Sequence, residues 1–92
     1  MEKSNFTREE RADISKKFRE EIASHGLANS ILSVLQSQSA KVEVKKTVLM
    51  QQCRKKDFAK KFKAACEDLR VAYPSMKMEL RAFARDICPS ES

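Results

Sequence analysis

The stretch DFAKKFKAACEDLRVAY, residues 57–73, decides the fold that we expect for this chain. Its apolar residues recur at intervals of three and four, which places them along one side of an α-helix. Asp57 can cap the start of this helix, and Pro74 cannot continue it, so the sequence marks both of its ends. The residues of the predicted buried side are Phe58, Phe62, Ala65, Cys66, Leu69 and Tyr73.

The helix with the clearest end signals is expected upstream, from Arg8 to His25. Thr7 and Glu10 have the spacing of a capping box, in which each side chain accepts a hydrogen bond from the other residue's backbone N–H. Gly26 can adopt the left-handed conformation that commonly ends a helix. The apolar residues of this segment follow every fourth position, at Ile14, Phe18 and Ile22.

Three more segments have helical spacing of their apolar residues. One covers about 28–36, with Leu27, Ile31, Val34 and Leu35 on its apolar side. Another, which Ser75 can cap and Pro89 ends, has Met76, Leu80, Phe83, Ala84 and Ile87 on that side. The third covers about 41–54, where Val42, Leu49 and Cys53, with Val48 and Met50 beside them, fit a helix. Val42 and Val44 also alternate with charged residues as in a strand, but a lone strand would have no partner, so we expect a helix.

Composition supports an all-α fold. The 92 residues include one glycine and two prolines, 35% are charged and 41% are hydrophobic, which disfavours both a turn-rich β-sandwich and wholesale disorder. Five amphipathic helices with short connections predict a compact orthogonal bundle. A chain of this length makes one domain, so we expect a single domain over residues 1–92, with frayed ends at about 1–6 and 89–92.

The three cysteines, Cys53, Cys66 and Cys88, are too far apart in the sequence for the paired ligands of a closed zinc site. Their odd number also argues against a disulfide framework, so we expect reduced thiols and an intracellular location, cytoplasmic or nuclear. No apolar run approaches the ~20 residues of a membrane span, and the first residues lack the apolar core of a signal peptide. We therefore expect no membrane span and no metal.

Catalytic signatures are also missing from the sequence. His25, the only histidine, stands at a helix end, where it suits the negative pole of the helix dipole. A single glycine cannot form a glycine-rich loop around a phosphate. The expected protein is not an enzyme and uses no small-molecule cofactor.

Positive charge is concentrated in residues 41–63, which hold nine basic and two acidic residues, whereas the rest of the chain is nearly neutral within a total of +6. On a helical wheel Lys56, Lys60, Lys63 and Arg70 form a ridge away from the apolar side, interrupted by Glu67, and Lys61 lies on the other flank. Charge of one sign often marks a surface that meets an oppositely charged one. The candidate binding residues are Lys41, Lys45, Lys46, Arg54, Lys55, Lys56, Lys60, Lys61, Lys63 and Arg70.

Several partners fit this surface. The first prediction is an adaptor-like module that recognises an acidic protein surface. The alternative is sequence-independent binding to the backbone of duplex RNA or DNA by the same residues, with a homodimer as one form of it. Backbone contact is favoured over base stacking because the aromatic residues lie on core stripes or, in the case of Phe6, beside a helix cap. An anionic membrane surface is a further acidic partner. The charges could also be a solvated face that only keeps the chain soluble. A further reading is an apolar groove for a peptide helix or a second copy, with Met50, Met76 and Met78 as adaptable side chains.

Overall fold

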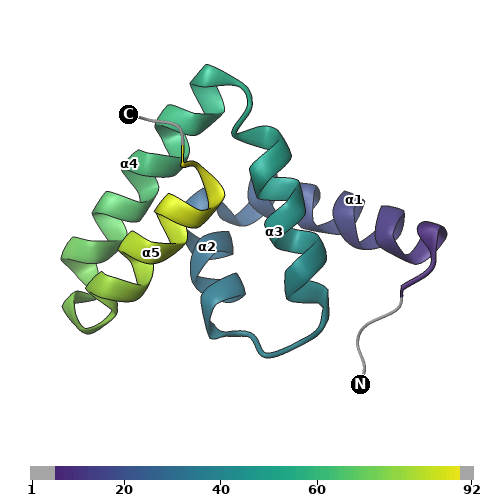
Figure 1. The fold of residues 1–92 in the computed structure, drawn as a ribbon, viewed down its shortest axis with the longest axis horizontal. Coiled ribbons are helices and arrows are strands. Elements are labelled where there is room, and N and C mark those ends of the chain that lie inside the picture. The colour runs from purple at the N-terminus through teal and green to yellow at the C-terminus, as the bar shows by residue number, and fades with distance from the viewer. Residues whose placement is uncertain (1–5, 90–92) are drawn as a thin grey trace. The chain divides into compact units, whose positions relative to one another are not determined.

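A computed structural model describes residues 6–89, and this part of the chain contains five α-helices and no strand (Figure 1). The helices are α1 (Arg8–His25), α2 (Leu27–Gln36), α3 (Lys41–Gln52), α4 (Lys56–Ala72) and α5 (Lys77–Ile87), with a 3₁₀ turn, η1 (Pro74–Met76), between the last two. The predicted all-α fold with about five short helices is confirmed, including the choice of helix for α3. The expected frayed ends lie largely outside the described residues; Phe6 and Pro89, which are described, belong to no helix.

The chain forms two compact units, Met1–Val48 and Leu49–Ser92. In the first unit α1 packs against α2, and in the second α4 packs against α5 and η1. Helix α3 crosses the boundary, because Val48 belongs to the first unit and Leu49 to the second. Each unit thus has its own pair of packed helices.

The ends of α1 follow from local chemistry. The Thr7 N–H donates to Glu10 Oε1 at 2.9 Å, and the Glu10 N–H donates to Thr7 Oγ1 at 3.1 Å, so the predicted capping box is present. At the other end Gly26 donates its N–H to the Ile22 carbonyl at 3.0 Å. Its φ of 93° is positive as expected, but its ψ of 153° lies far from the left-handed helical value. This extended conformation lets α2 begin directly at Leu27.

The buried residues of the first unit come from all three of its helical segments. They are Ile14, Phe18, Ser30, Ile31, Val34, Val44 and Val48. The predicted stripe of α3 is partly wrong, because Val42 and Cys53 are only half-buried and Met50 is exposed, whereas Val44 is buried. Val44 and Val48 are one helical turn apart, and the buried Leu49 follows Val48 directly, so these three residues mark the side that α3 buries.

The second unit has a core of apolar side chains from α4 and α5, with the Phe62 and Phe83 rings 5.9 Å apart and inclined by 46°. The buried residues of this core are Phe62, Cys66, Leu69, Leu80, Phe83, Ile87 and Cys88. The spacing of residues 57–73 therefore predicts Phe62, Cys66 and Leu69 correctly, whereas Phe58 and Ala65 are only half-buried and Tyr73 is exposed. Tyr73 is 43% exposed because the helix has ended there, with φ at −128°.

Two predicted caps are wrong. Helix α4 begins at Lys56, so Asp57 lies inside its first turn, where its negative charge favours the positive pole of the helix dipole. Ser75 lies within η1 and not before α5, because Pro74 has a backbone angle suited to the first position of a helical turn. Neither Lys55 before α4 nor Met76 before α5 makes a capping hydrogen bond with its side chain.

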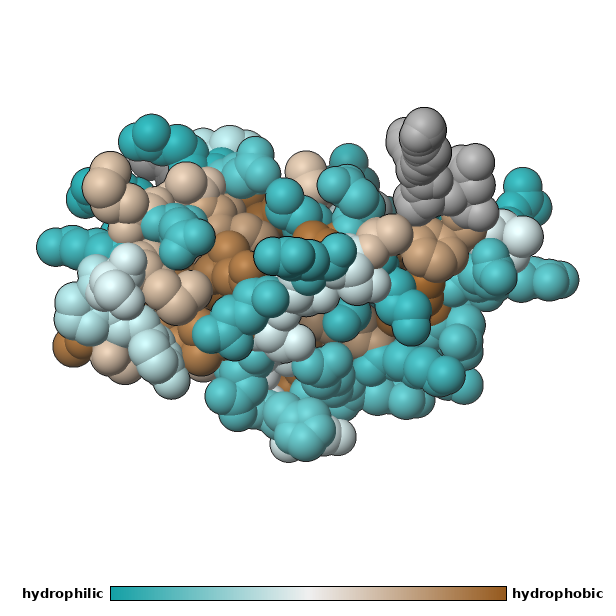
Figure 2. Space-filling view, turned by 90° about the horizontal axis from the view of Figure 1, so that it is seen from below, coloured by the Kyte–Doolittle hydropathy of each residue, from teal (hydrophilic) through white to brown (hydrophobic). Residues whose placement is uncertain are grey.

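Apolar side chains also reach the surface around the connection between α4 and α5. Val71 and Met78 are 79% and 82% exposed, and Tyr73 lies between them in the sequence. Figure 2 shows apolar side chains among hydrophilic ones on the left of the view, the side on which this connection lies in Figure 1. Met76 is half-buried. Of the methionines predicted for an apolar groove, Met50 and Met78 are therefore exposed.

Candidate cationic groove between α4 and α5

Helix α4 presents the predicted lysines to solvent because its apolar side packs into the core of the second unit. Four lysines of this helix are exposed, at Lys56, Lys60, Lys61 and Lys63. Arg54 and Lys55 are exposed as well, in the turn that joins α3 to α4. All six of these cations belong to the second unit.

A cavity of about 300 Å³ lies beside this helix, between α4 and the last turn of α5. Three cations line it: Lys63 and Arg70 come from α4, and Arg85 comes from α5. Glu67 is the acidic residue of the lining, and its Oε2 lies 2.8 Å from Nη2 of Arg70, whose side chain is 24% exposed. The Arg85 side chain forms no ion pair with the residues that the structure describes. We call this cavity, with Lys63, Arg70 and Arg85, the cationic groove.

The wall of the cationic groove also contains two cysteines, Cys66 and Cys88, which are 3% and 7% exposed. Cys53, in the turn after α3, is hydrogen-bonded to Cys88. Burial, and secondly the neighbouring Cys88, raise the pKa of Cys53 to about 12. Burial raises the pKa of Cys66 to about 11, against the opposite influence of Arg70. These two thiols are therefore protonated at neutral pH.

The basic residues of α3 have different surroundings. Lys41 and Lys45 line a cavity of about 140 Å³ in the first unit together with the acidic Asp13 and Glu21 of α1. The Lys45 Nζ lies 5.5 Å from the centre of the Phe18 ring, within the range of a cation–π contact. Acids and an aromatic ring thus surround these two lysines, so they add less positive potential to the surface than the lysines of α4.

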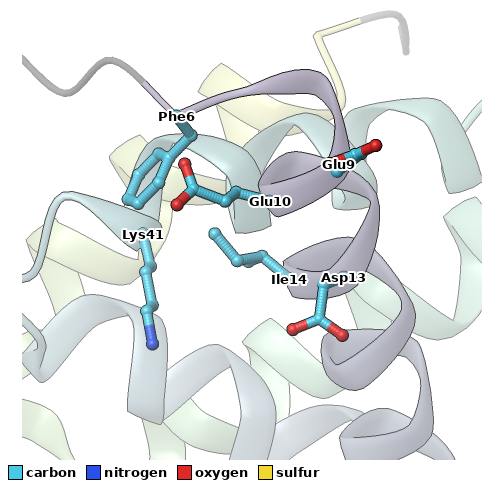
Figure 3. Close-up of a pocket in the computed structure, with 6 residues that line it drawn as sticks. All are labelled: Phe6, Glu9, Glu10, Asp13, Ile14 and Lys41. Atoms are coloured by element: carbon cyan, nitrogen blue, oxygen red, sulfur yellow. The ribbon is translucent and has the colours of Figure 1, made fainter.

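Lys41 also borders a larger cavity, of about 340 Å³, at the start of α1. Figure 3 shows that the Glu10 side chain extends between Phe6 and Ile14, and that the Lys41 side chain lies opposite, at the start of α3. Glu9 and Asp13 complete the acidic part of the lining (Figure 3). Lys41, the first cation of the predicted basic window, therefore shares the lining of this cavity with carboxylates of α1.

The structure thus divides the predicted binding residues between the two units. Lys41, Lys45 and the half-buried Lys46 belong to the first, whereas the residues from Arg54 to Arg70 belong to the second. The sequence-based prediction missed Arg85, because it followed the charge along residues 41–63 and the helix that ends near Tyr73, and did not include the last helix. The recurrence of Arg81 and Arg85 at one helical turn on α5 was the available signal.

Other kinds of site have little support in the described part of the chain. Among residues 6–89, no group of three or more His, Cys, Asp and Glu side chains is placed to hold a metal ion. Within the same residues, no helix combines the length and the apolar composition needed to cross a lipid bilayer. None of the three cavities described above is lined by a methionine.

The main candidate for a functional surface lies in the second unit. Its distinctive surface is the exposed lysines of α4 together with the cationic groove beside them. Comparison with known proteins found no matching family model, no similar curated protein and no similar solved structure.

Proposed function

We propose that this chain is a non-enzymatic adaptor or binding module that recognises an acidic protein surface through α4 and the cationic groove. The observation that supports this function is the convergence of Lys63, Arg70 and Arg85, from two helices, on one cavity beside exposed lysines. A guanidinium group can bind a carboxylate through two parallel hydrogen bonds, so this pairing depends on the orientation of the two groups as well as on their charge. Exposed lysines around such a centre mainly accelerate the encounter with a negatively charged partner.

The lysines of α4 are suited to this role because they contribute little to the fold. They lie outside the apolar side that contains Phe62, Cys66 and Leu69, and they are exposed. Substitution of exposed side chains away from the core usually changes stability by less than about 0.5 kcal/mol. A change of binding after such substitutions therefore reports on the surface and not on folding.

The test is a pull-down from cell extract with the full chain and a charge-reversed variant in which Lys56, Lys60, Lys61 and Lys63 are changed to glutamate. We expect the variant to keep its helical circular dichroism spectrum and to lose the partner. A matched control reverses four exposed cations of α1, at Arg8, Arg11, Lys16 and Arg19, and so has the same net charge. Retention of the partner by the α4 variant, or equal loss in both variants, would count against this surface.

A second candidate function is binding to the phosphate backbone of duplex RNA or DNA through the same lysines. Lys56, Lys60 and Lys63 are spaced by three or four on one side of α4, an arrangement that can follow a row of phosphates. A parallel pull-down from nuclease-treated extract separates the two functions. Nuclease destroys a contact that depends on nucleic acid and leaves a direct contact with an acidic protein intact. In gel-shift titrations the log affinity must also fall steeply with log salt, and sedimentation would show whether a homodimer binds.

We further propose an intracellular location, cytoplasmic or nuclear. The hydrogen-bonded thiols of Cys53 and Cys88 are free, and free neighbouring thiols persist in reducing compartments. Fractionation of cells that express the tagged chain tests this location, and recovery in a secreted fraction would contradict it.

A further inference from the structure

Cys88 occupies a special place in the second unit, because it belongs to the cationic groove and also touches a second thiol. It is the residue that follows α5, and its N–H donates to the Ala84 carbonyl at 2.9 Å. It lines the cavity with Lys63, Arg70 and Arg85, and it is hydrogen-bonded to Cys53. A molecule that enters the groove therefore meets a thiol whose neighbour is another thiol.

The groove favours one chemical class of reactant. Its three cations and single carboxylate give its lining a formal charge of +2, so small anions are concentrated there and small cations are repelled. Its volume of about 300 Å³ is at the lower end of the range for small-molecule sites, about 300–1,000 Å³. Planar guanidinium groups suit carboxylates in particular.

We propose that Cys88 is a modification site for thiol–disulfide exchange with a small disulfide that carries carboxylates, and that Cys53 resolves the product. In the first step the Cys88 thiolate attacks one sulfur of the small disulfide. The bond between the two sulfurs of that molecule breaks as the bond to Cys88 forms. One half leaves as a thiolate and takes up the proton that Cys88 gave to water.

In the second step the Cys53 sulfur attacks the sulfur of Cys88 and releases the other half of the small molecule. The product is a Cys53–Cys88 disulfide, which joins the turn after α3 to the end of α5. Over both steps two protein thiols are oxidised to one disulfide, and the small disulfide is reduced to two thiols. No other oxidant is required, and neither step depends on the partner proposed above.

The environment of the thiols sets the order of the steps. Only a thiolate attacks, and burial holds the pKa of Cys53 at about 12, so we expect Cys88 and not Cys53 to attack the small disulfide first. Cys66 is 3% exposed and its pKa is raised to about 11 by burial, which leaves it unreactive. Cys66 therefore provides an internal control.

The test incubates the reduced full chain, without oxygen, with glutathione disulfide as the anionic probe, and follows intact mass and peptide maps. We expect one glutathionyl group, on Cys88, followed by the Cys53–Cys88 disulfide. Cys53→Ser should stop the reaction at the mixed disulfide, Cys88→Ser should prevent both products, and Cys66→Ser should change neither. Circular dichroism of each variant establishes that it is folded.

Charge selectivity is tested with two further probes, the cationic disulfide cystamine and the neutral hydroxyethyl disulfide. Arg85→Gln should slow exchange with glutathione disulfide by about threefold, the effect of one solvent-exposed ion pair, and leave the neutral probe unaffected. Arg81→Gln, an exposed change on the same helix, is the matched control. The proposal is overturned if Cys88→Ser is modified as fast as the native chain, or if Arg85→Gln slows all three probes equally.

Discussion

The ammonium group of Lys45 lies 5.5 Å from the centre of the Phe18 ring, so a lysine of the basic window contacts a core side chain of the first unit. Asp13 and Glu21 line the cavity next to this lysine. Lys60 has the same charge and belongs to the same window, but it is exposed on α4. Equal charges in one stretch of sequence therefore have different roles in the folded chain.

This difference predicts unequal effects on stability. Lys45→Gln should lower the free energy of unfolding by about 0.5–1 kcal/mol, the contribution of a cation–π contact near the surface. Lys60→Gln, the matched control, should change it by less than about 0.5 kcal/mol. Urea titrations followed by circular dichroism measure both values. Equal effects of the two substitutions would show that the Phe18 contact adds nothing.

The aromatic pair of the second unit predicts the most damaging substitution. Phe62 is fully buried and its ring packs against Phe83, so Phe62→Ala removes most of a core side chain from a small unit. The expected loss is about 3–5 kcal/mol, a large share of the 5–15 kcal/mol typical of whole proteins. Thermal melts should therefore show a strongly lowered or absent transition. Val71→Ala, at a site that is 79% exposed, should melt like the native chain.

The backbone conformation of Gly26 predicts that alanine and asparagine at this position destabilise the chain equally. Its angles, φ 93° and ψ 153°, lie in a region that side-chain-bearing residues avoid, although a Cβ at this position would meet no atom within 4 Å. The cost therefore comes from the backbone alone, about 1–3 kcal/mol, and applies to Gly26→Ala and Gly26→Asn alike. Denaturant midpoints of both variants test this. A clearly milder effect of asparagine would mean that the residue shifts to the left-handed helical region, which asparagine tolerates.

Replacement of the buried Ser30 is expected to stabilise the chain. The Ser30 side chain is fully buried in α2, and its Oγ has no hydrogen-bond partner among the described residues. Ser30→Ala removes this unsatisfied hydroxyl group and should raise the free energy of unfolding by about 1 kcal/mol. The control is Ser33→Ala, three residues further along α2, because Ser33 is only half-buried and its substitution corrects for the better helix propensity of alanine. A gain no larger than that of the control would contradict the prediction.

The buried thiols predict a loss of stability in alkali. The pKa of Cys53 rises from 9.0 to about 12 and that of Cys66 to about 11 in the folded chain, so the folded state holds these protons more tightly than the unfolded state. Their contribution is complete below pH 9 and is lost as the pH rises toward 11 and 12. Cys53→Ser should flatten this decline in urea titrations at increasing pH. A decline identical to that of the native chain would show that other groups cause it.

Much of the fold could be predicted because helix formation depends on local chemistry. The capping box at Thr7 and Glu10, the positive φ at Gly26 and the buried spacing from Phe62 to Leu69 all involve residues within one or two turns of each other. Predictions failed where two local signals competed. Asp57 and Ser75 are both good capping residues, but the helical start at Lys56 and the 3₁₀ turn from Pro74 place them inside helical turns.

The candidate site could be predicted only in part. The sequence by itself determined an all-α chain with a basic stretch and with lysines on the side of α4 away from its apolar face, because helical periodicity fixes which residues share a side. Only the tertiary structure brought Arg85 beside Lys63 and Arg70, joined Cys53 to Cys88, and set Lys45 against Phe18. These contacts join residues from different helices. How two helices pack depends on the shapes of both buried faces, and neither sequence stretch contains that information alone.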